Sequence, residues 1–150
     1  MVTPNAFEAN LLTGLPLTNL ATAKTAISAL HDLGPQIVVI TSMIWSNRPR
    51  KLIMMVSEKE LGTWCVEMEK VQGHYTGTGD LVAALLLAHE HTYEGNGENK
   101  WATILSNVTN TMQGVIRRTH EGGGGELKLI QSKADIEKKT WEGGAAAWKV

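Results

Sequence analysis

Residues 73–80 read GHYTGTGD, and the run that follows, residues 81–88, reads LVAALLLA. Glycine has no Cβ, so a loop with three glycines in seven residues can turn its backbone N–H groups toward a ligand. The apolar run predicts a helix, and a helix N-terminus offers unpaired N–H groups and a partial positive charge. The stretch therefore predicts an anion site where a glycine loop, residues 73–80, enters a helix.

Asp80 closes this glycine loop and falls in the first turn of the predicted helix. The helix dipole favours an ionised carboxylate there by roughly 0.3–1 kcal/mol. An anion cradle beside a carboxylate suits phosphoryl transfer, because the N–H groups can hold the moving phosphate while the carboxylate accepts the proton of the attacking hydroxyl. A tight turn followed by an ordinary acidic first-turn residue is the alternative interpretation.

The chain before the glycine loop predicts two helices, one buried strand and a hairpin. Asn5 caps a helix over 6–12, and Thr18 or Asn19 caps a second helix that ends before Gly34. Residues 37–40, IVVI, are typical of a strand covered on both faces, as in a parallel sheet. An antiparallel pair, predicted over residues 52–56 and 63–71, leads into the glycine loop.

The chain after the glycine loop predicts one long helix and a weakly patterned end. Apolar residues at helical spacing predict a helix from Trp101 to about Arg118. Residues 122–125 form a glycine spacer, a short extended segment and a turn of helix follow, and the tail after Thr140 shows no packing pattern. The order of elements predicts an α/β fold, and only three strands are evident, so the sequence looks like half of a larger sheet.

Composition narrows the class of protein. The chain has 150 residues, the length of one domain, and a net charge of −1, which points to neither nucleic acid nor an anionic membrane as a partner. The single cysteine, Cys65, excludes an intramolecular disulfide and fits a reducing compartment. No apolar run approaches the ~18 residues of a membrane span, and the first residues do not resemble a signal peptide. We therefore expect a soluble, cytoplasmic protein with an inert thiol.

Two further pairs of polar residues are candidates for ligand binding. Asn5 and Glu8 lie three apart at a helix start and could hold Mg²⁺, directly or through its waters, although spacing alone favours a simple capping pair. Thr41 and Ser42 follow the buried strand, where α/β sheets place their ligands, and could equally cap the strand end. His74, inside the glycine loop, could touch a nucleotide, although its position favours an exposed loop residue. Neither a P-loop nor a dinucleotide fingerprint is present.

Several motifs together resemble a known family. They are TPNAFEA at 3–9, LLTG at 11–14, VVITS at 38–42, TGTGDL at 76–81, QSK at 131–133 and DIE at 135–137. In this order they resemble the C-terminal half of the pyridoxal kinases, in the ribokinase-like superfamily. The resemblance implies that residues 2–137 form the C-terminal, nucleotide-binding half of a ribokinase-like domain. Residues 138–150, beyond the resemblance and without a packing pattern, are expected to form a mobile tail.

The resemblance also implies a role for each matched residue. Asp80 is the implied catalytic base toward the 5′-hydroxyl of pyridoxal, and Gly77, Thr78 and Gly79 are the implied anion hole for the γ-phosphate of ATP. Asn5 and Glu8 match the motif that organises Mg²⁺ and the nucleotide phosphates, which favours ligand binding over the capping pair. The other matched positions are Thr3 and Thr41 for a monovalent cation (K⁺ or Na⁺), and Thr41, Ser42, Val71, Gln72, Gly73 and Thr78 for the nucleotide.

The implied activity is the ATP-dependent phosphorylation of pyridoxal to pyridoxal 5′-phosphate, by a protein that is a homodimer in the full-length family. The helix from Trp101 to Arg118 is implied to wall the adenine. The family's N-terminal half has no counterpart here, so residues 37–40 are expected to lose neighbouring strands and expose apolar surface. Two alternatives stay open: a catalytically inactive fragment that binds nucleotide or a partner, and a related kinase for a hydroxymethylpyrimidine or a sugar.

Overall fold

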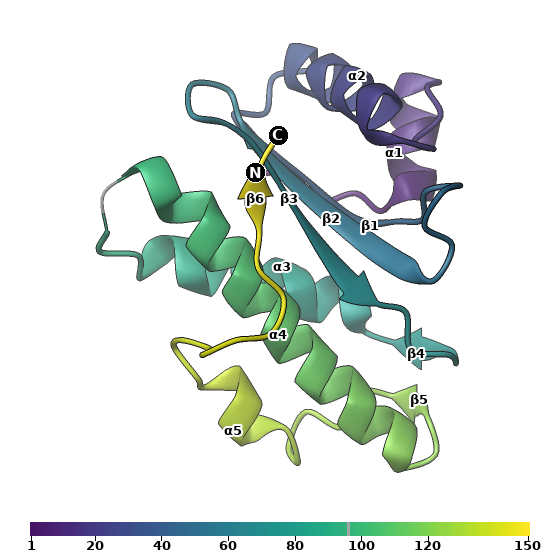
Figure 1. Ribbon diagram of the computed structural model, residues 1–150, viewed down its shortest axis with the longest axis vertical. Helices are drawn as coiled ribbons and strands as arrows, with labels where there is room; N and C mark the ends of the chain where they lie inside the picture. Colours follow the sequence, from purple (N-terminus) through teal and green to yellow (C-terminus); the bar gives the residue numbers. More distant parts are fainter. Residues whose placement is uncertain (96) are drawn as a thin grey trace.

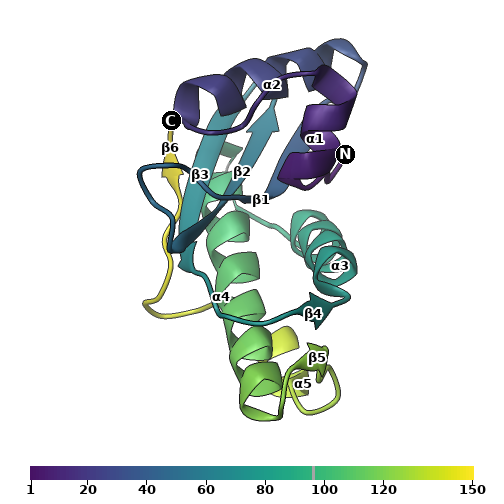
Figure 2. The ribbon, with the colours of Figure 1, turned by 90° about the vertical axis from the view of Figure 1, so that its right-hand side faces the viewer.

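The fold is a sheet between two layers of helices, and the computed structural model describes residues 1–95 and 97–150 (Figures 1 and 2). The main sheet has the order β1-β2-β3-β6, and each neighbouring pair is antiparallel. Its strands are β1 (Ile37–Met43), β2 (Lys51–Glu58), β3 (Gly62–Glu69) and β6 (Trp148–Lys149). The predicted α/β class, with an antiparallel hairpin and flanking helices, is confirmed.

The α-helices begin and end close to the predicted positions, whereas one short 3₁₀ helix was not predicted. The helices are α1 (Ala6–Thr13), α2 (Leu20–Asp32), α3 (Thr78–His91), the short 3₁₀ helix η1 (Gly97–Asn99), α4 (Lys100–Glu121) and α5 (Lys133–Ile136). Asn5 and Asn19 each cap a helix by accepting a hydrogen bond from a backbone N–H three residues on, as their sequence context predicts. Gly14 ends α1 with a left-handed φ of 70°, a conformation that glycine adopts without strain.

Each face of the sheet is covered by its own pair of helices. Met54 and Val56 of β2 pack in a core with α3 and α4, whereas Ile53 and Met55 pack in a second core with α1 and α2. Successive strand residues point to opposite faces, so a strand buried on both sides reads as a continuous apolar run. This arrangement explains why the middle of β2, residues 52–56, shows no alternation of polar and apolar residues.

The strand direction expected for residues 37–40 is wrong for the main sheet. β1 pairs antiparallel with β2, and its parallel contact is an isolated bridge between Val2 and Val38. Val2 donates to the Ile37 carbonyl at 3.0 Å and accepts from Val39 at 2.9 Å. The apolar run indicates that both faces of the strand are buried. Antiparallel strands between two helix layers are also buried on both faces, so the run does not determine strand direction.

The predicted exposure of residues 37–40 is also wrong. Val38, Val39 and Ile40 are fully buried, because α1 and α2 cover one face and α3 and α4 the other. Large exposed apolar side chains lie elsewhere, among them Phe7 on α1, Leu87 on α3 and Ile130 before α5, exposed by 70%, 65% and 89%. The exposed apolar surface is therefore spread over helices and loops and does not include residues 38–40 of β1.

The segment expected to form a mobile tail, residues 138–150, has definite packing partners. Trp141 Nε1 donates to Thr111 Oγ1 of α4 at 3.1 Å, and the Asn110 side chain both donates to and accepts from the backbone of Ala145. Beyond these contacts β6 pairs with the edge of β3 (Figure 1). The partners lie far away in the sequence, so no local pattern reveals them.

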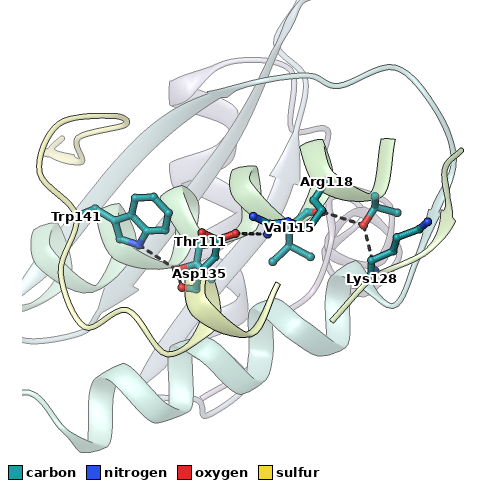
Figure 3. A network of polar contacts seen from close by, with 7 residues as sticks. Thr111, Val115, Arg118, Lys128, Asp135 and Trp141 are labelled. Atoms are coloured by element: carbon teal, nitrogen blue, oxygen red, sulfur yellow. Dashed lines mark hydrogen bonds and ion pairs between the residues drawn. The ribbon is translucent and has the colours of Figure 1, made fainter. Parts of the chain in front are cut away.

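Polar side chains on α4 also hold the chain between Leu127 and Trp141 (Figure 3). Arg118 forms an ion pair with Asp135 of α5, and Thr119 Oγ1 accepts from the backbone of Lys128 at 3.1 Å. Such contacts explain why α4 buries four polar residues beside its apolar stripe: Asn107, Asn110, Thr111 and Thr119. Thr109 is buried as well, but its hydroxyl has no hydrogen-bond partner among the described residues.

Within residues 1–95 and 97–150, no helix is both long and apolar enough to cross a bilayer.

Candidate active site

A cleft of about 630 Å³ opens where β1 and β3 end and β2 begins, a size typical of small-molecule sites. Its walls come from the N-terminal residues with α1, the end of β1, the exit of β3, the glycine loop with the start of α3, and one face of α4. The predicted residues that line it are Thr3, Asn5, Glu8, Thr41, Ser42, Val71, Gly73, Thr78, Gly79 and Asp80.

Two predicted residues, Gln72 and Gly77, do not line this cleft. The Gln72 carbonyl accepts a hydrogen bond from the Tyr75 hydroxyl at 2.6 Å, on the approach to the glycine loop. Gly77 occupies the N-cap of α3 with a φ of 89°, a left-handed conformation that an L side chain rarely adopts. Both residues therefore shape the loop that presents its neighbours to the cleft.

The start of α3 is built to leave backbone N–H groups available. The N-cap residue, Gly77, has no side chain, so it supplies no capping hydrogen bond to the first turn. Thr78, Gly79 and Asp80 of that turn line the cleft. A Cβ added at Gly79 would meet no atom of the protein within 4 Å, so packing alone does not require a glycine there. Glycine at 79 instead leaves space for a ligand against the helix N-terminus.

Asn5 and Glu8 form a reciprocal capping box at the start of α1. Asn5 Oδ1 accepts from the Glu8 backbone at 2.9 Å, and Glu8 Oε2 accepts from the Asn5 backbone at 2.8 Å. The capping pair that spacing alone favours is therefore present. Both side chains also line the cleft, and Glu8 has a second carboxylate oxygen that the cap does not use.

The metal-binding capacity of this part of the cleft is modest. No group of three or more His, Cys, Asp or Glu side chains that could hold a metal ion occurs in residues 1–95 and 97–150. Asn5 and Glu8 together offer few oxygens, which suits Mg²⁺, because this ion keeps several waters and uses one or two protein carboxylates. The residues present fit a largely hydrated Mg²⁺ and not a cage of protein ligands.

The end of β1 brings its two hydroxyl residues beside the N-terminal segment. The Thr41 N–H donates to the Pro4 carbonyl at 3.0 Å, which fixes Thr41 beside Thr3 and Asn5. Thr3, Thr41 and Ser42 are each half-buried and line the cleft. The three hydroxyls therefore face the same space as the capping box.

Sequence reasoning missed several cleft residues. Lys70 supplies a positive charge to the cleft that the acidic Glu8, Glu69 and Asp80 also line, and His74, exposed as expected, lines it as well. No local pattern marks Lys70, because its position depends on how the hairpin exits toward α4. The remaining lining residues are Leu52, Met54, Met68, Tyr75, Val82, Ala83, Met112, Gln113 and Ile116.

One wall of the cleft comes from α4. Met112 and Ile116 present apolar surface, and the Gln113 amide donates to the Glu69 carbonyl at 3.2 Å, which ties α4 to the end of β3. A flat apolar wall suits an aromatic ring. The helix that the resemblance assigns to the adenine therefore lies on the cleft.

Comparison with known proteins gives the family. Residues 1–96 match the model of the phosphomethylpyrimidine kinase family, which is more than half of the 150-residue chain. The chain belongs to this family.

Its curated relatives include pyridoxal kinases. The pyridoxal kinase PdxY of Leifsonia xyli is 32% identical over 133 residues, which are 89% of this chain and 45% of the relative. The human pyridoxal kinase is 33% identical over 159 residues, covering 91% of this chain and 50% of the relative. The chain therefore spans about half the length of the curated relatives it matches.

Solved structures of pyridoxal kinases also match this chain. The structure of Plasmodium falciparum PdxK with AMP-PNP and PL matches with a TM-score of 0.83 at 26% identity, covering 99% of this chain and 49% of that one. The pyridoxal kinase of Leishmania donovani in complex with ADP also matches with a TM-score of 0.83, at 25% identity over 99% of this chain and 51% of that one. These matches confirm the resemblance to pyridoxal kinases over about half their length.

Proposed function

We propose that this chain is the nucleotide-binding half of a pyridoxal kinase, which transfers the γ-phosphate of ATP to the 5′-hydroxyl of pyridoxal. The observation that carries the proposal is the cleft, where segments far apart in the sequence gather the glycine loop, Asp80 and the Asn5–Glu8 pair. Relatives named pyridoxal kinase, and structures with an ATP analogue or ADP, support this substrate pair.

In the proposed reaction Asp80 accepts the proton of the attacking hydroxyl. The N–H groups of Thr78 and Gly79 at the start of α3 hold the transferring phosphate, with Gly77 shaping the turn. A bound Mg²⁺ would neutralise charge on the phosphates. Asn5 and Glu8 would hold its water shell, while the hydroxyls of Thr3 and Thr41 would lie near a monovalent cation.

The nucleotide would extend from these phosphates across the cleft toward α4. Ser42, Val71 and Gly73 would contact it directly, with Gln72 acting through the loop backbone. The adenine would lie against the apolar wall that Met112 and Ile116 form. Lys70 would add a positive charge beside the phosphates, a role that the sequence did not suggest.

The proposal includes the extent of the domain, the cellular compartment and the oligomeric state of the enzyme. Residues 2–137 would form the nucleotide-binding half of the domain, and the single buried cysteine fits a reducing, cytoplasmic compartment. We propose a homodimer for the complete enzyme. Sedimentation of that enzyme would test this state, and a monomer at working concentration would contradict it.

A second candidate function is nucleotide binding without catalysis. It is favoured by one observation: the chain spans about half the length of its relatives. A purified sample given ATP, Mg²⁺ and pyridoxal separates the two functions. Formation of pyridoxal 5′-phosphate supports the kinase, whereas ATP binding without product supports the second candidate.

The choice of substrate needs its own comparison, because the matching family is described by a pyrimidine substrate. Turnover of pyridoxal should exceed turnover of a hydroxymethylpyrimidine and of a sugar under the same conditions. A preference for the pyrimidine would contradict the assignment to pyridoxal while leaving the kinase chemistry intact.

A further inference from the structure

We propose that Tyr75 is a positioning residue, which sets the place of the glycine loop through a hydrogen-bonded pair with His120. The inference rests on the function proposed above, since that function gives the glycine loop its chemical task. Tyr75 lies in the short strand β4 (Tyr75–Thr76), directly before Gly77. His120 lies in the last turn of α4.

The hydroxyl of Tyr75 joins two parts of the chain that are 45 residues apart. It donates to the Gln72 carbonyl at 2.6 Å and lies 2.9 Å from His120 Nδ1. The single phenolic hydrogen is directed to the carbonyl, so the hydroxyl oxygen accepts from an N–H at Nδ1. The two rings meet edge to face, with centroids 6.5 Å apart and an interplanar angle of 63°.

Gly73 makes this arrangement possible. Its φ of 133° is rarely adopted by an L side chain, and an added Cβ would lie 2.7 Å from the Tyr75 hydroxyl oxygen. The ring of Tyr75 therefore folds back over Gly73 and closes residues 72–75 into a compact turn. The first glycine of the loop serves this turn, a role different from the anion cradle that its position in the motif suggests.

A short ladder reinforces the attachment to α4. β4 pairs in parallel with β5 (Gly125–Glu126), which follows α4 directly, and the Gly125 N–H donates to the His74 carbonyl at 3.3 Å. α4 also supplies a wall of the cleft. The approach to the glycine loop is therefore fastened to the same helix that faces the nucleotide.

Packing against α4, with Val82 in the core, holds the body of α3. Its N-cap, Gly77, makes no side-chain hydrogen bond, so the exact place of the N–H groups at Thr78 and Gly79 also depends on what holds residues 72–76. Displacing a catalytic group by about 1 Å can cost roughly 10²-fold in rate. Tyr75 acts through this geometry, because its hydroxyl is engaged by Gln72 and His120 and is not free for a ligand.

The first test measures hydrogen exchange of residues 72–80 in the 150-residue chain without ligand. Tyr75→Phe and His120→Ala should each raise this exchange several-fold, and the double variant should add little, because both changes remove the same bond. His120→Asn is the matched control, since its amide nitrogen can replace the Nδ1 donor and should restore slow exchange. Residues of α2 should exchange at an unchanged rate in every variant.

Two outcomes of this test would overturn the proposal. Exchange of residues 72–80 that does not change in Tyr75→Phe would show that the hydroxyl does not hold the loop. Faster exchange throughout the chain, α2 included, would show a general loss of stability in place of positioning. Neither outcome depends on turnover, so the pair is tested even if the chain proves not to be a kinase.

The second test uses turnover of pyridoxal by the active enzyme. Tyr75→Phe keeps the ring against the cleft and should lower kcat roughly tenfold while KM for ATP changes less than about twofold. His120→Asn should recover most of the lost kcat. A raised KM with unchanged kcat would overturn the positioning role, because it would show that the hydroxyl contacts the substrate.

Discussion

At the scale of single residues, two side chains of the candidate site combine a structural task with a place on the cleft. Asn5 and Glu8 cap α1 and also face the cleft. The cap holds each side chain in one orientation, so binding a hydrated cation would need little further ordering. The capping box is therefore compatible with ligand binding. From the spacing of Asn5 and Glu8 alone, helix capping and metal binding are alternatives.

Asp80 is the residue whose replacement tests the proposed chemistry most directly. In the active enzyme Asp80→Asn should lower turnover by roughly 10²–10⁴-fold, the usual contribution of a general base, while ATP affinity changes little. Steady-state kinetics and calorimetric titration with ATP measure the two quantities. Asp135→Asn, a carboxylate change away from the cleft, is a control. Undiminished turnover of the Asp80 variant would leave Asp80 as an ordinary first-turn residue.

Cys65 gives a prediction about alkaline pH. Burial raises the pKa of its thiol from about 9.0 to about 12, an effect that Arg48 partly offsets. The neutral thiol is favoured in the folded state, so ionisation of Cys65 does not lower the stability of the fold below pH 9. Between about pH 9 and 12 the unfolded chain ionises first, and stability falls by up to roughly 1.4 kcal/mol per pH unit.

Urea denaturation across this pH range, compared with Cys65→Ala, measures the contribution of Cys65. The difference in unfolding free energy between the two proteins should shrink as the pH rises, because only the parent chain carries the thiol. A constant difference would contradict the buried, neutral thiol. The expected inert character of Cys65 also predicts slow alkylation of the native chain near neutral pH.

At the scale of elements, local signals predicted the helices well and strand pairing poorly. Asn5 and Asn19 mark two helix starts because caps act within a few residues. The direction of β1 and the place of β6 depend on partners distant in sequence, which no local pattern encodes. The polar motifs of the cleft were predicted because each is local in the sequence. Lys70 and Gln113 became evident only in the fold, because their places depend on contacts between distant segments.

Gly114 on α4 offers a prediction that opposes the usual rule for helices. Glycine to alanine inside a helix normally adds about 0.5–1 kcal/mol of stability. Here the new Cβ would lie 3.1 Å from Asp135 Oδ2 and 3.2 Å from Cγ, and the ion pair with Arg118 holds that carboxylate in place. We expect Gly114→Ala to lose about 1 kcal/mol, as in overpacked sites.

The matched background for this prediction is Asp135→Ala. Without the carboxylate, Gly114→Ala should recover the ordinary gain of about 0.5–1 kcal/mol. Urea denaturation of the parent chain, of each single variant and of the double variant gives the coupling free energy between the two positions. Stabilisation by Gly114→Ala in the parent chain would show that α5 yields to the new methyl group.

At the scale of the whole molecule, residues 141–150 link one helix layer, through α4, to the edge of the main sheet. They contact α4 through Thr111 and Asn110, and they end on β3, where the Val150 N–H donates to the Thr63 carbonyl at 2.9 Å. Deleting them would leave the Asn110 amide, 8% exposed, without the Ala145 backbone. A buried polar group without a partner costs about 1–3 kcal/mol.

We therefore expect deletion of residues 141–150 to lower the melting temperature and to promote aggregation through the uncovered edge of β3. Thermal unfolding and light scattering measure these effects. Asn110→Ala in the full chain should reproduce part of the loss of stability without the aggregation, because β6 stays in place. An unchanged melting temperature after deletion would favour the mobile tail that the sequence suggested.

The two chain ends lie at opposite edges of the sheet, with the N-terminal segment beside β1 and β6 beside β3 (Figure 2). Thr3 and Asn5 line the cleft, whereas Val150 ends beside β3. A purification tag or a fluorescent fusion attached before Met1 would emerge next to the cleft and obstruct the entry of a ligand. The same fusion after Val150 would stand clear of the opening, so C-terminal tethering is the orientation to choose for immobilised ligand-capture measurements.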